Sequence, residues 1–370
     1  MPPEPGWRGA VVGAMKTGSA RNGKANEAAR QLQRRLAGRS GRATLRRVEV
    51  AELSIERRRV GRGFVYIRDG RRLRDERVLF RLKRLAVPPA YKDVRYAEDP
   101  RAHIQAVGRD DAGRIQYRYH QDWEKLREKR KARRLRELLD ALPRIRTAIS
   151  RSLRATEITR EYTLAALIEL IALTALRPGS ETYARQHGTR GAATLLKSDV
   201  TITGDKIALR FTGKGGKLIE REVRSRRLAA AIKKLLALPG RRLFQYRDAD
   251  GAIVVARRRD ANAYLHGIAS EQITLKDFRT LLACARALES LVRLEPKPSE
   301  AGRRRQLKEC LCAVSEELAN TPAICRKSYV HAVVVEAFEN GSLKTAAARN
   351  GRRANQGEAL LRAVLGSAGG

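Results

Sequence analysis

A tyrosine near the end of a strongly basic chain has the type and the setting for covalent chemistry. Tyr329 lies in the stretch from Ala319 to His331, with Arg326 and Lys327 just before it. A phenol has an ordinary pKa of about 10, so it attacks at neutral pH only when cations or a base lower that value. The setting therefore predicts a nucleophile for a phosphodiester. A core tyrosine with a hydrogen-bonded hydroxyl is the alternative interpretation.

Two basic residues upstream could bind and activate a phosphate. Arg177 follows a long apolar segment, and a guanidinium can present two donors to phosphate oxygens. Lys214 lies in the Gly-rich segment Gly213–Lys217, where an ammonium could give a proton to a leaving oxygen, although Lys217 could do the same. Taken singly, Arg177 is more typical of a helix-terminating arginine and the Gly-rich segment of a solvated turn.

Two more polar groups complete an ordered set. Lys276 and Arg279 stand three residues apart at an expected helix start, so they can project to one side and bind an anion there. Asn320 precedes Tyr329 by nine residues and could donate to a phosphate oxygen, or else simply cap a helix. Arg177, Lys214, Arg279, Asn320 and Tyr329 together could bind, neutralise and attack a phosphate without a metal.

The elements that must position this set fall into two groups. Over residues 48–120, apolar and polar residues alternate in short runs that are separated by turn signals such as Asp69-Gly70. This pattern predicts a small, mainly β domain. Residues 121–344 begin with a highly charged helix to residue 142 and a buried helix over 161–176, and they carry a β-hairpin insertion over 200–223. Further helices are expected at residues 226–238, 261–269, 276–293, 302–318 and 329–340. The fold class is therefore α+β, with basic disordered tails over residues 1–47 and 345–370.

The overall charge favours a polyanionic partner. The chain of 370 residues has 78 Lys and Arg against 40 Asp and Glu, a net charge of +38, spread along its whole length. Such a surplus is typical of nucleic-acid binding, and an anionic membrane surface is the weaker alternative. No apolar run is long enough to span a bilayer, so we expect a cytoplasmic, nucleoid-associated protein. The four cysteines lack a second metal-ligand pair, so Cys310 and Cys312 could hold zinc only with ligands from elsewhere. We expect reduced thiols, no metal and no cofactor.

Longer strings carry a resemblance to a known family. Residues 50–342 resemble the type IB DNA topoisomerases of the compact bacterial and poxvirus kind, in the following strings: Gly61–Phe64, Leu85–Val94, His103–Ala106, Gly113–His120, Leu243–Tyr246, Asn262–Leu265, Lys276–Arg279, Asn320–Pro322 and Tyr329–His331. The resemblance implies a monomer that clamps double-stranded DNA between a small β domain and a larger helical catalytic domain, and that relaxes supercoils of either sign without ATP or metal.

The same resemblance implies a role for each residue of the set. Tyr329 would form a 3′-phosphotyrosyl bond, Lys214 would protonate the 5′-oxygen, and Arg177, Arg279 and Asn320 would stabilise the transition state. Seven residues would contact DNA: Gln116, Tyr117, Arg118, Tyr119, Tyr183, Lys217 and Lys276.

Some positions depart from the family pattern, and two other functions stay open. Pro178–Ser180 stands where many relatives have Val-Gly-Asn, and Tyr91 replaces a usual Trp. A tyrosine site-specific recombinase has related chemistry, but it usually carries His where this chain has Lys276 and Asn320. A non-catalytic basic DNA-binding protein would explain the charge but not the ordered set.

Overall fold

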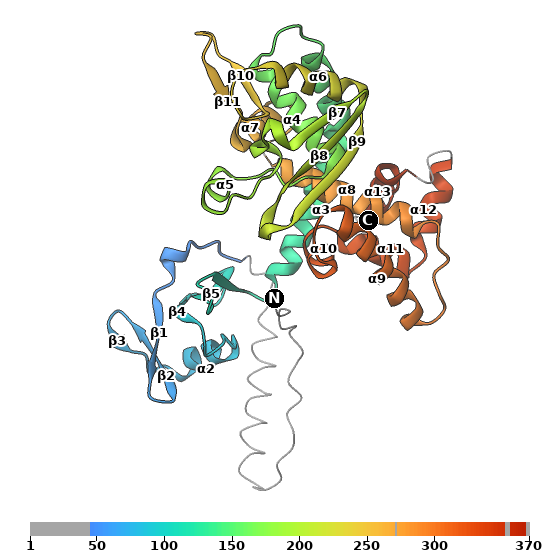
Figure 1. The fold of residues 1–370 in the computed structure, drawn as a ribbon. Coiled ribbons are helices and arrows are strands. Elements are labelled where there is room, and N and C mark those ends of the chain that lie inside the picture. The colour runs from blue at the N-terminus through green and yellow to red at the C-terminus, as the bar shows by residue number, and fades with distance from the viewer. Residues whose placement is uncertain (1–44, 271, 352–355, 368–370) are drawn as a thin grey trace. The chain divides into compact units, whose positions relative to one another are not determined.

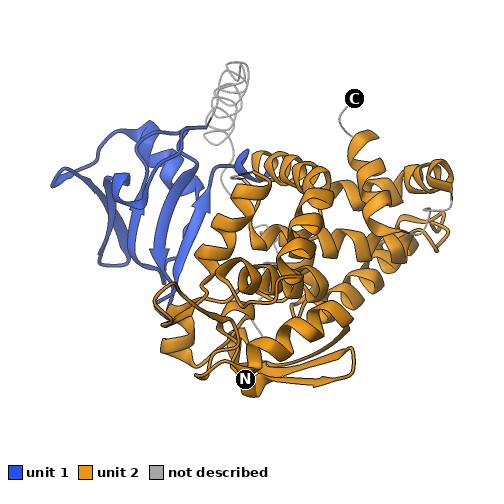
Figure 2. Ribbon diagram, turned by 90° about the horizontal axis from the view of Figure 1, so that it is seen from above, with its two compact units in different colours: residues 1–124 blue, residues 125–370 orange. Residues whose placement is uncertain are grey.

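The protein divides into two units, Met1–Glu124 and Lys125–Gly370, each with its own hydrophobic core (Figures 1 and 2). The computed structural model describes residues 45–270, 272–351 and 356–367. Most of the predicted N-terminal tail, residues 1–44, lies outside the described residues. The predicted domain boundary after residue 120 corresponds to a division after Glu124.

The first unit is built on one antiparallel sheet, as the alternating pattern predicted. Its six strands follow the order β3-β2-β1-β4-β5-β6, so β6 forms one edge. The strands are β1 (Ile55–Val60), β2 (Gly63–Arg68), β3 (Arg71–Arg72), β4 (Lys92–Tyr96), β5 (Ile104–Arg109) and β6 (Ile115–Tyr119). One helix, α2 (Glu76–Arg84), buries Leu82 against Ile55 and Tyr96 of the sheet, and Asp75 caps its first turn.

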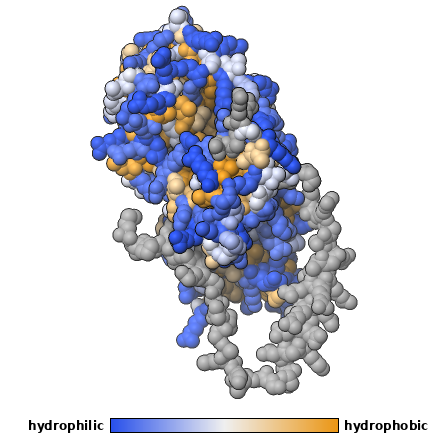
Figure 3. Space-filling model, turned by 90° about the vertical axis from the view of Figure 1, so that its right-hand side faces the viewer, coloured by the Kyte–Doolittle hydropathy of each residue, from blue (hydrophilic) through white to orange (hydrophobic). Residues whose placement is uncertain are grey.

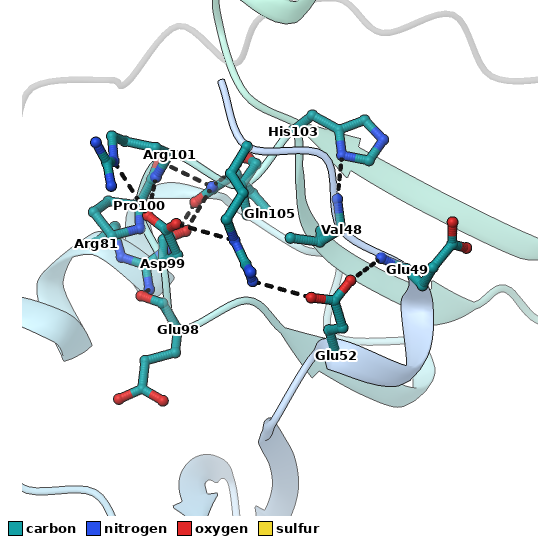
Figure 4. A network of polar contacts seen from close by, with 12 residues as sticks. Val48, Glu49, Glu52, Arg81, Glu98, Asp99, Pro100, Arg101, His103 and Gln105 are labelled. Carbon is teal, nitrogen blue, oxygen red and sulfur yellow. Dashed lines mark hydrogen bonds and ion pairs between the residues drawn. The ribbon is translucent and has the colours of Figure 1, made fainter. Parts of the chain in front are cut away.

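A polar network fastens α2 to the sheet (Figure 4). The guanidinium of Arg81 donates to Oε1 of Gln105 and to the carbonyl of Ala97, each at 2.7 Å. Gln105 in turn donates to the carbonyl of Ala102 at 2.7 Å. Burial lowers the pKa of Arg81. Arg81 is half-buried, and its terminal nitrogens are paired with acceptors from the sheet and the segment that follows β4.

The second unit is mainly helical. Its helices are α3 (Trp123–Leu153, which begins two residues before the division), α4 (Arg160–Thr174), α5 (Glu181–His187), α6 (Arg226–Ala237), α7 (Arg258–Ile268), α8 (Leu275–Leu291), α9 (Glu300–Glu317), α10 (Pro322–Ser328), α11 (Ala332–Glu339), α12 (Ser342–Asn350) and α13 (Gly357–Ser367). Helix α4 is apolar around nearly its whole circumference and lies at the centre of the core, in contact with α6, α7 and α8.

Two small antiparallel sheets are inserted among these helices. One contains β7 (Val200–Thr203), β8 (Lys206–Thr212) and β9 (Leu218–Arg224), in that order, and matches the predicted insertion. The other pairs β10 (Gln245–Arg247) with β11 (Ile253–Val255). The Gly-rich segment joins β8 to β9, so the sheet carries Lys214 at its tip.

The predicted C-terminal tail is wrong for the residues that the structure describes. Residues 342–350 and 357–367 form α12 and α13, not a disordered basic tail. Leu360 and Leu361 of α13 are fully buried, and α13 packs against α8. The apolar side chains of α13 recur at helical spacing, and burying them outweighs the local Gly- and Arg-rich composition.

Candidate active site

Tyr329 lies at the C-terminal end of α10, against a buried arginine. Thr321 caps α10 by accepting from the backbone N–H of Ile324 at 3.3 Å, and the Tyr329 N–H donates to the carbonyl of Cys325 at 3.0 Å. The Tyr329 side chain is 9% exposed, and the guanidinium carbon of Arg279 lies 5.0 Å from its ring centroid. The predicted helix over residues 329–340 begins later, at Ala332, which leaves Tyr329 between two helices.

The surrounding cations make the phenol of Tyr329 more acidic. Burial alone would raise its pKa, because a buried phenolate is poorly solvated. The charge and hydrogen bonding of Arg279 lower the pKa, and the charges of Arg177 and Lys276 add to that effect. The net result is a pKa below the ordinary value, which is the condition that a tyrosine nucleophile requires.

Arg279 is the fifth residue of α8 and projects into the interior. It is 2% exposed, and it donates to the carbonyls of Ala175 and, at 3.1 Å, of Leu318. Burial lowers its pKa. Among the described residues, the Nε of Arg279 has no hydrogen-bond partner. A buried donor without a partner costs free energy, so this N–H is available to an anion that enters the site.

Arg177 and Asn320 are joined directly. Arg177 follows α4, and Ala175, which caps the C-terminal end of that helix, has a left-handed conformation with φ of 49°. The two terminal nitrogens of Arg177 donate to the carbonyl of Ala319 at 3.3 Å, and one of them also donates to Oδ1 of Asn320. Asn320 thus uses its acceptor to hold Arg177, and its amide N–H₂ makes only a 3.4 Å bond to the carbonyl of Leu318. This leaves Asn320 as a donor and not as an acid or base.

Lys214 reaches the same small pocket as the two arginines. The pocket is lined by Arg177, Lys214 and Arg279, together with backbone near Ala319, whereas Lys217 does not line it. The turn is tight at Gly213, where an added Cβ would lie 2.6 Å from a side-chain carbon of Ile219. The structure therefore brings Arg177, Lys214 and Arg279 together around one pocket, with Asn320 bonded to Arg177 and Tyr329 packed on Arg279.

Sequence reasoning missed Arg221, which lines this pocket as well. Arg221 lies on β9 and donates to the carbonyls of Glu316 at 3.0 Å and Glu317 at 2.5 Å. Its Nε is a second buried donor without a hydrogen-bond partner among the described residues. A signal was present in the sequence, because Ile219, Arg221 and Val223 alternate along the strand on the face that packs inward. An arginine at an inward position of a strand is an indicator of a functional or paired charge.

The backbone just after Tyr329 is held from two helices. The Cys284 thiol on α8 donates to the carbonyl of Tyr329 at 3.4 Å and accepts from the N–H of His331 at 3.3 Å. Burial raises the pKa of Cys284 to about 11, so the thiol keeps the proton that it donates. Lys131 on α3 donates to the carbonyl of Val330 at 3.3 Å. These bonds fix the chain on the C-terminal side of the candidate nucleophile.

His331 adds a further anchor and is not placed as a base. Its Nδ1 accepts from the N–H of Val333 at 3.0 Å, so Nε2 carries the proton and donates to the carbonyl of Glu128 at 3.0 Å. Burial lowers the pKa of His331, which favours this neutral form. Both ring nitrogens are therefore engaged in structure.

The residues predicted to contact DNA lie outside the pocket. In the second unit Lys276, Lys217 and Tyr183 are exposed, and Tyr183 lies on α5 with 55% of its surface accessible. In the first unit, β6 carries the other four at the sheet edge: Gln116, Tyr117, Arg118 and Tyr119. The rings of Tyr117 and Tyr119 are exposed and stacked, with centroids 5.9 Å apart.

The described residues, those of this pocket included, form no group of three or more His, Cys, Asp or Glu side chains that could hold a metal ion. The four cysteines are free thiols, and Cys284, Cys310 and Cys325 are buried. Among the same residues, no helix has the length and apolar character to cross a membrane.

The matching family models and a curated relative agree on one family. A family model described as eukaryotic DNA topoisomerase I, catalytic core, matches residues 118–354, and a model of the bacterial DNA topoisomerase IB N-terminal domain matches residues 63–110. A DNA topoisomerase 1B of Acanthamoeba polyphaga mimivirus is 32% identical over 267 residues, which cover 70% of this chain and 80% of the relative.

Among solved structures, the XerH site-specific recombinase bound to palindromic difH substrate, in a post-cleavage complex, matches at 16% identity and a TM-score of 0.34. That match covers 53% of this chain and 50% of the recombinase. The pre-cleavage complex of XerH with difH matches at 13% identity and a TM-score of 0.33.

Proposed function

Because the chain belongs to the type IB DNA topoisomerase family, we propose that it relaxes supercoils of either sign by cutting and rejoining one strand of duplex DNA. The protein is a DNA topoisomerase, an isomerase, and double-stranded DNA is its substrate. Its chemistry conserves bond energy, because a phosphodiester is exchanged for a phosphotyrosine and then restored. No ATP or metal is needed in this scheme.

The proposed reaction begins with the phenolate of Tyr329. Its oxygen attacks the phosphorus of one phosphodiester, the bond from phosphorus to the 5′-oxygen breaks, and a 3′-phosphotyrosyl bond forms. The phenol proton leaves to solvent, which the lowered pKa of Tyr329 favours. The free 5′-strand then turns about the intact strand, and its 5′-hydroxyl attacks the phosphotyrosine to restore the original bond.

Three residues are proposed to stabilise the charge on the transferring phosphate. Arg177 and Arg279 both line the pocket, and Arg279 has a buried N–H without a partner among the described residues. Asn320 adds an uncharged donor beside Arg177. Donors fixed in advance in a partly buried site stabilise a developing negative charge far better than water does.

Lys214 is proposed as the acid that protonates the departing 5′-oxygen. It lines the pocket with Arg177 and Arg279, whereas Lys217 does not, and this difference favours Lys214. The Gly-rich turn lets the lysine approach a bound strand. Lys217, Lys276, Tyr183 and the β6 residues are proposed to contact the duplex around this centre.

The observation that carries the proposal is Tyr329, made acidic by Arg279 and packed on this arginine, which lines one pocket with Arg177 and Lys214. The test is relaxation of supercoiled plasmid in EDTA without ATP, comparing the natural chain with Tyr329→Phe. We expect relaxation only by the natural chain. Trapping the natural chain on DNA with denaturant should also yield a covalent adduct at a 3′-phosphate.

Failure of the natural chain to relax plasmid over a range of salt would contradict the proposal. A product with exchanged strands would then favour site-specific recombination, and binding without cleavage would favour a passive DNA-binding role. If Tyr329→Phe relaxed the plasmid, another nucleophile would be required.

We also propose that the protein acts as a monomer that clamps the duplex with both units, and that it is associated with the bacterial nucleoid. The support is the basic charge of the whole chain and the family's DNA substrate. Sedimentation of the protein with a short duplex tests whether it acts as a monomer. One protein molecule per duplex would support a monomer, and two would contradict it.

A further inference from the structure

A second hollow of the catalytic unit gathers five arginines among the eleven residues that line it. Its walls come from α5, the segment that leads to β7, the turn before β10, and the connection between β11 and α7. Figure 1 shows α5, α7 and β11 along one side of this unit. The charged residues of the wall are Arg185, Arg190, Arg241, Arg242, Arg257 and a single carboxylate, Glu181.

Two of these arginines are already in ion pairs with carboxylates. Arg190 forms an ion pair with the buried carboxylate of Asp199 at 2.8 Å. Arg242 pairs with Glu181 and also donates to the carbonyl of Thr194 at 2.6 Å. The one carboxylate in the wall, Glu181, is therefore already paired with Arg242. Arg190 and Arg242 are held in place by their partners and form a fixed frame for the hollow.

The charges of the other three arginines are not balanced by a carboxylate of any described residue. Arg185, Arg241 and Arg257 are exposed, and the structure records no ion pair for their side chains with any described residue. Guanidinium groups that share a concave surface repel one another and concentrate a positive potential there. Their planar forks match phosphate oxygens, so a phosphate group would relieve the repulsion and pair with several donors.

The position of the hollow indicates which phosphate it would take. Arg190 lines both this hollow and the pocket that contains Arg177, Lys214 and Arg279. The two cavities therefore adjoin within one unit. A DNA strand carries phosphates at regular short intervals, so a strand with one phosphate in the pocket has others within reach of the hollow.

We propose that this arginine hollow, formed by Arg185, Arg241 and Arg257 on a frame of Arg190 and Arg242, binds a backbone phosphate of the duplex close to the phosphate that Tyr329 attacks. The hollow would fix the register of the DNA on the catalytic unit without taking part in bond breaking. This inference rests on the proposed function, since it assumes that the pocket receives a DNA phosphate.

The experiment measures binding of a short duplex as a function of salt, in a Tyr329→Phe background so that no strand is cut. The test variant carries Arg185→Gln, Arg241→Gln and Arg257→Gln. The control variant carries Arg144→Gln, Arg293→Gln and Arg349→Gln, which removes the same charge from three exposed arginines that line neither cavity. Thermal unfolding checks that both variants fold.

The expected result is a smaller salt dependence for the test variant alone. Each phosphate contact contributes about 0.9 to the slope of log affinity against log salt, so the slope should fall by at least about that amount. A duplex with one neutral methylphosphonate, moved along the strand, locates the contact. It should weaken binding of the parent at one position near the cleavage site and leave the test variant unaffected there.

Two results would overturn the inference. In the first, the slope of log affinity against log salt is the same for the test and control variants. In the second, no methylphosphonate position affects binding by the parent and the test variant differently. Plasmid relaxation by the natural chain distinguishes failure of this inference from failure of the proposed function. If the natural chain relaxes plasmid while the test and control variants bind alike, the hollow is not a phosphate site and the proposed function still holds.

Discussion

The acidity of Tyr329 depends on charges that come from separate parts of the chain. Arg279 contributes most of the stabilisation of the phenolate, followed by Arg177 and then Lys276. Of these three cations, Arg279 is the one that packs on the ring, so the phenol and this guanidinium act as one unit. Two tests at the scale of single residues follow from this arrangement, one for the nucleophile and one for the proton donor.

Replacing Arg279 with Gln should slow strand cleavage and shift its pH dependence upward. Cleavage rises with pH as the phenol loses its proton, and removing the nearest cation raises the pKa of Tyr329. The inflection of the pH profile should therefore move to higher pH, and the plateau should fall by roughly 100-fold or more, because a charge-stabilising donor is also lost. Single-turnover cleavage of a duplex, measured across pH, gives both values.

Two further variants calibrate this result. Arg279→Lys keeps the charge and should keep the inflection closer to that of the natural chain. Lys276→Gln removes the weakest of the three cations and should shift the inflection less than Arg279→Gln does. An Arg279→Gln profile with an unchanged inflection would show that the arginine does not set the acidity of the nucleophile.

Lys214 can be distinguished from Lys217 by the leaving group. With ordinary DNA, Lys214→Ala should reduce the cleavage rate by roughly 100-fold or more, as expected for loss of a general acid. With sulfur in place of the bridging 5′-oxygen, the leaving thiolate needs no proton, so most of that loss should disappear. Lys217→Ala should show a small loss of similar size on both substrates. Full rescue of Lys217→Ala, and not of Lys214→Ala, would assign the proton to Lys217.

At the scale of elements, the C-terminal helix supports the helix that carries Arg279. α13 packs on α8, and at Gly357 the two backbones approach so closely that an added Cβ would lie 2.5 Å from the carbonyl of Ala285. The Gly357 N–H also donates to Glu289 of α8 at 3.0 Å. α13 is bonded to α3 as well, through Arg362 to the carbonyl of Leu139 at 2.6 Å.

Gly357→Ala should therefore destabilise the catalytic unit. Overpacking of this kind costs about 1–3 kcal/mol, and each kcal/mol lowers Tm by roughly 2–4 °C in a unit of this size. Gly366 lies in the same helix with nothing within 4 Å of a new Cβ. Gly366→Ala should thus leave Tm unchanged or raise it slightly, through better helix propensity. Equal Tm values for the two variants would mean that α13 does not pack closely on α8.

The elements that the sequence could predict are those with strong local signals. The apolar run of α4, the Asn320-Thr321-Pro322 helix start and the alternation of β7 to β9 all depend on neighbouring residues. α13 was missed because its composition resembles a solvated tail. Its apolar face is buried only when the helix packs against α8, which the sequence alone does not show. Propensity is local, whereas burial is decided by the whole fold.

The candidate site was predictable to a different extent. Arg177, Lys214, Arg279, Asn320 and Tyr329 could be named from motif order. Their contacts could not, because the bond from Arg177 to Asn320 joins residues 143 positions apart. The same applies to Arg221, whose carbonyl acceptors on α9 lie about a quarter of the chain away. Motif order identifies chemistry, and only the fold identifies the residues that hold it in place.

At the scale of the whole molecule, the dominant property is a net charge of +38. Figure 3 shows a face on which hydrophilic residues predominate and apolar residues are scattered. Such a charge favours binding to any DNA at low salt, since the counterions released on binding gain entropy. Tight binding helps the first round of cleavage but slows transfer to a new DNA molecule.

Multiple-turnover relaxation should therefore have a salt optimum that single-turnover cleavage lacks. With plasmid in excess, the rate should rise with salt as release accelerates and then fall as binding weakens, while the rate with saturating enzyme should stay flat until binding fails. The test variant of the arginine hollow should reach its optimum at lower salt than the matched control, because it has lost a specific phosphate contact in addition to the same charge. Parallel curves for multiple and single turnover would show that release does not limit the enzyme, and that its charge serves only the encounter with DNA.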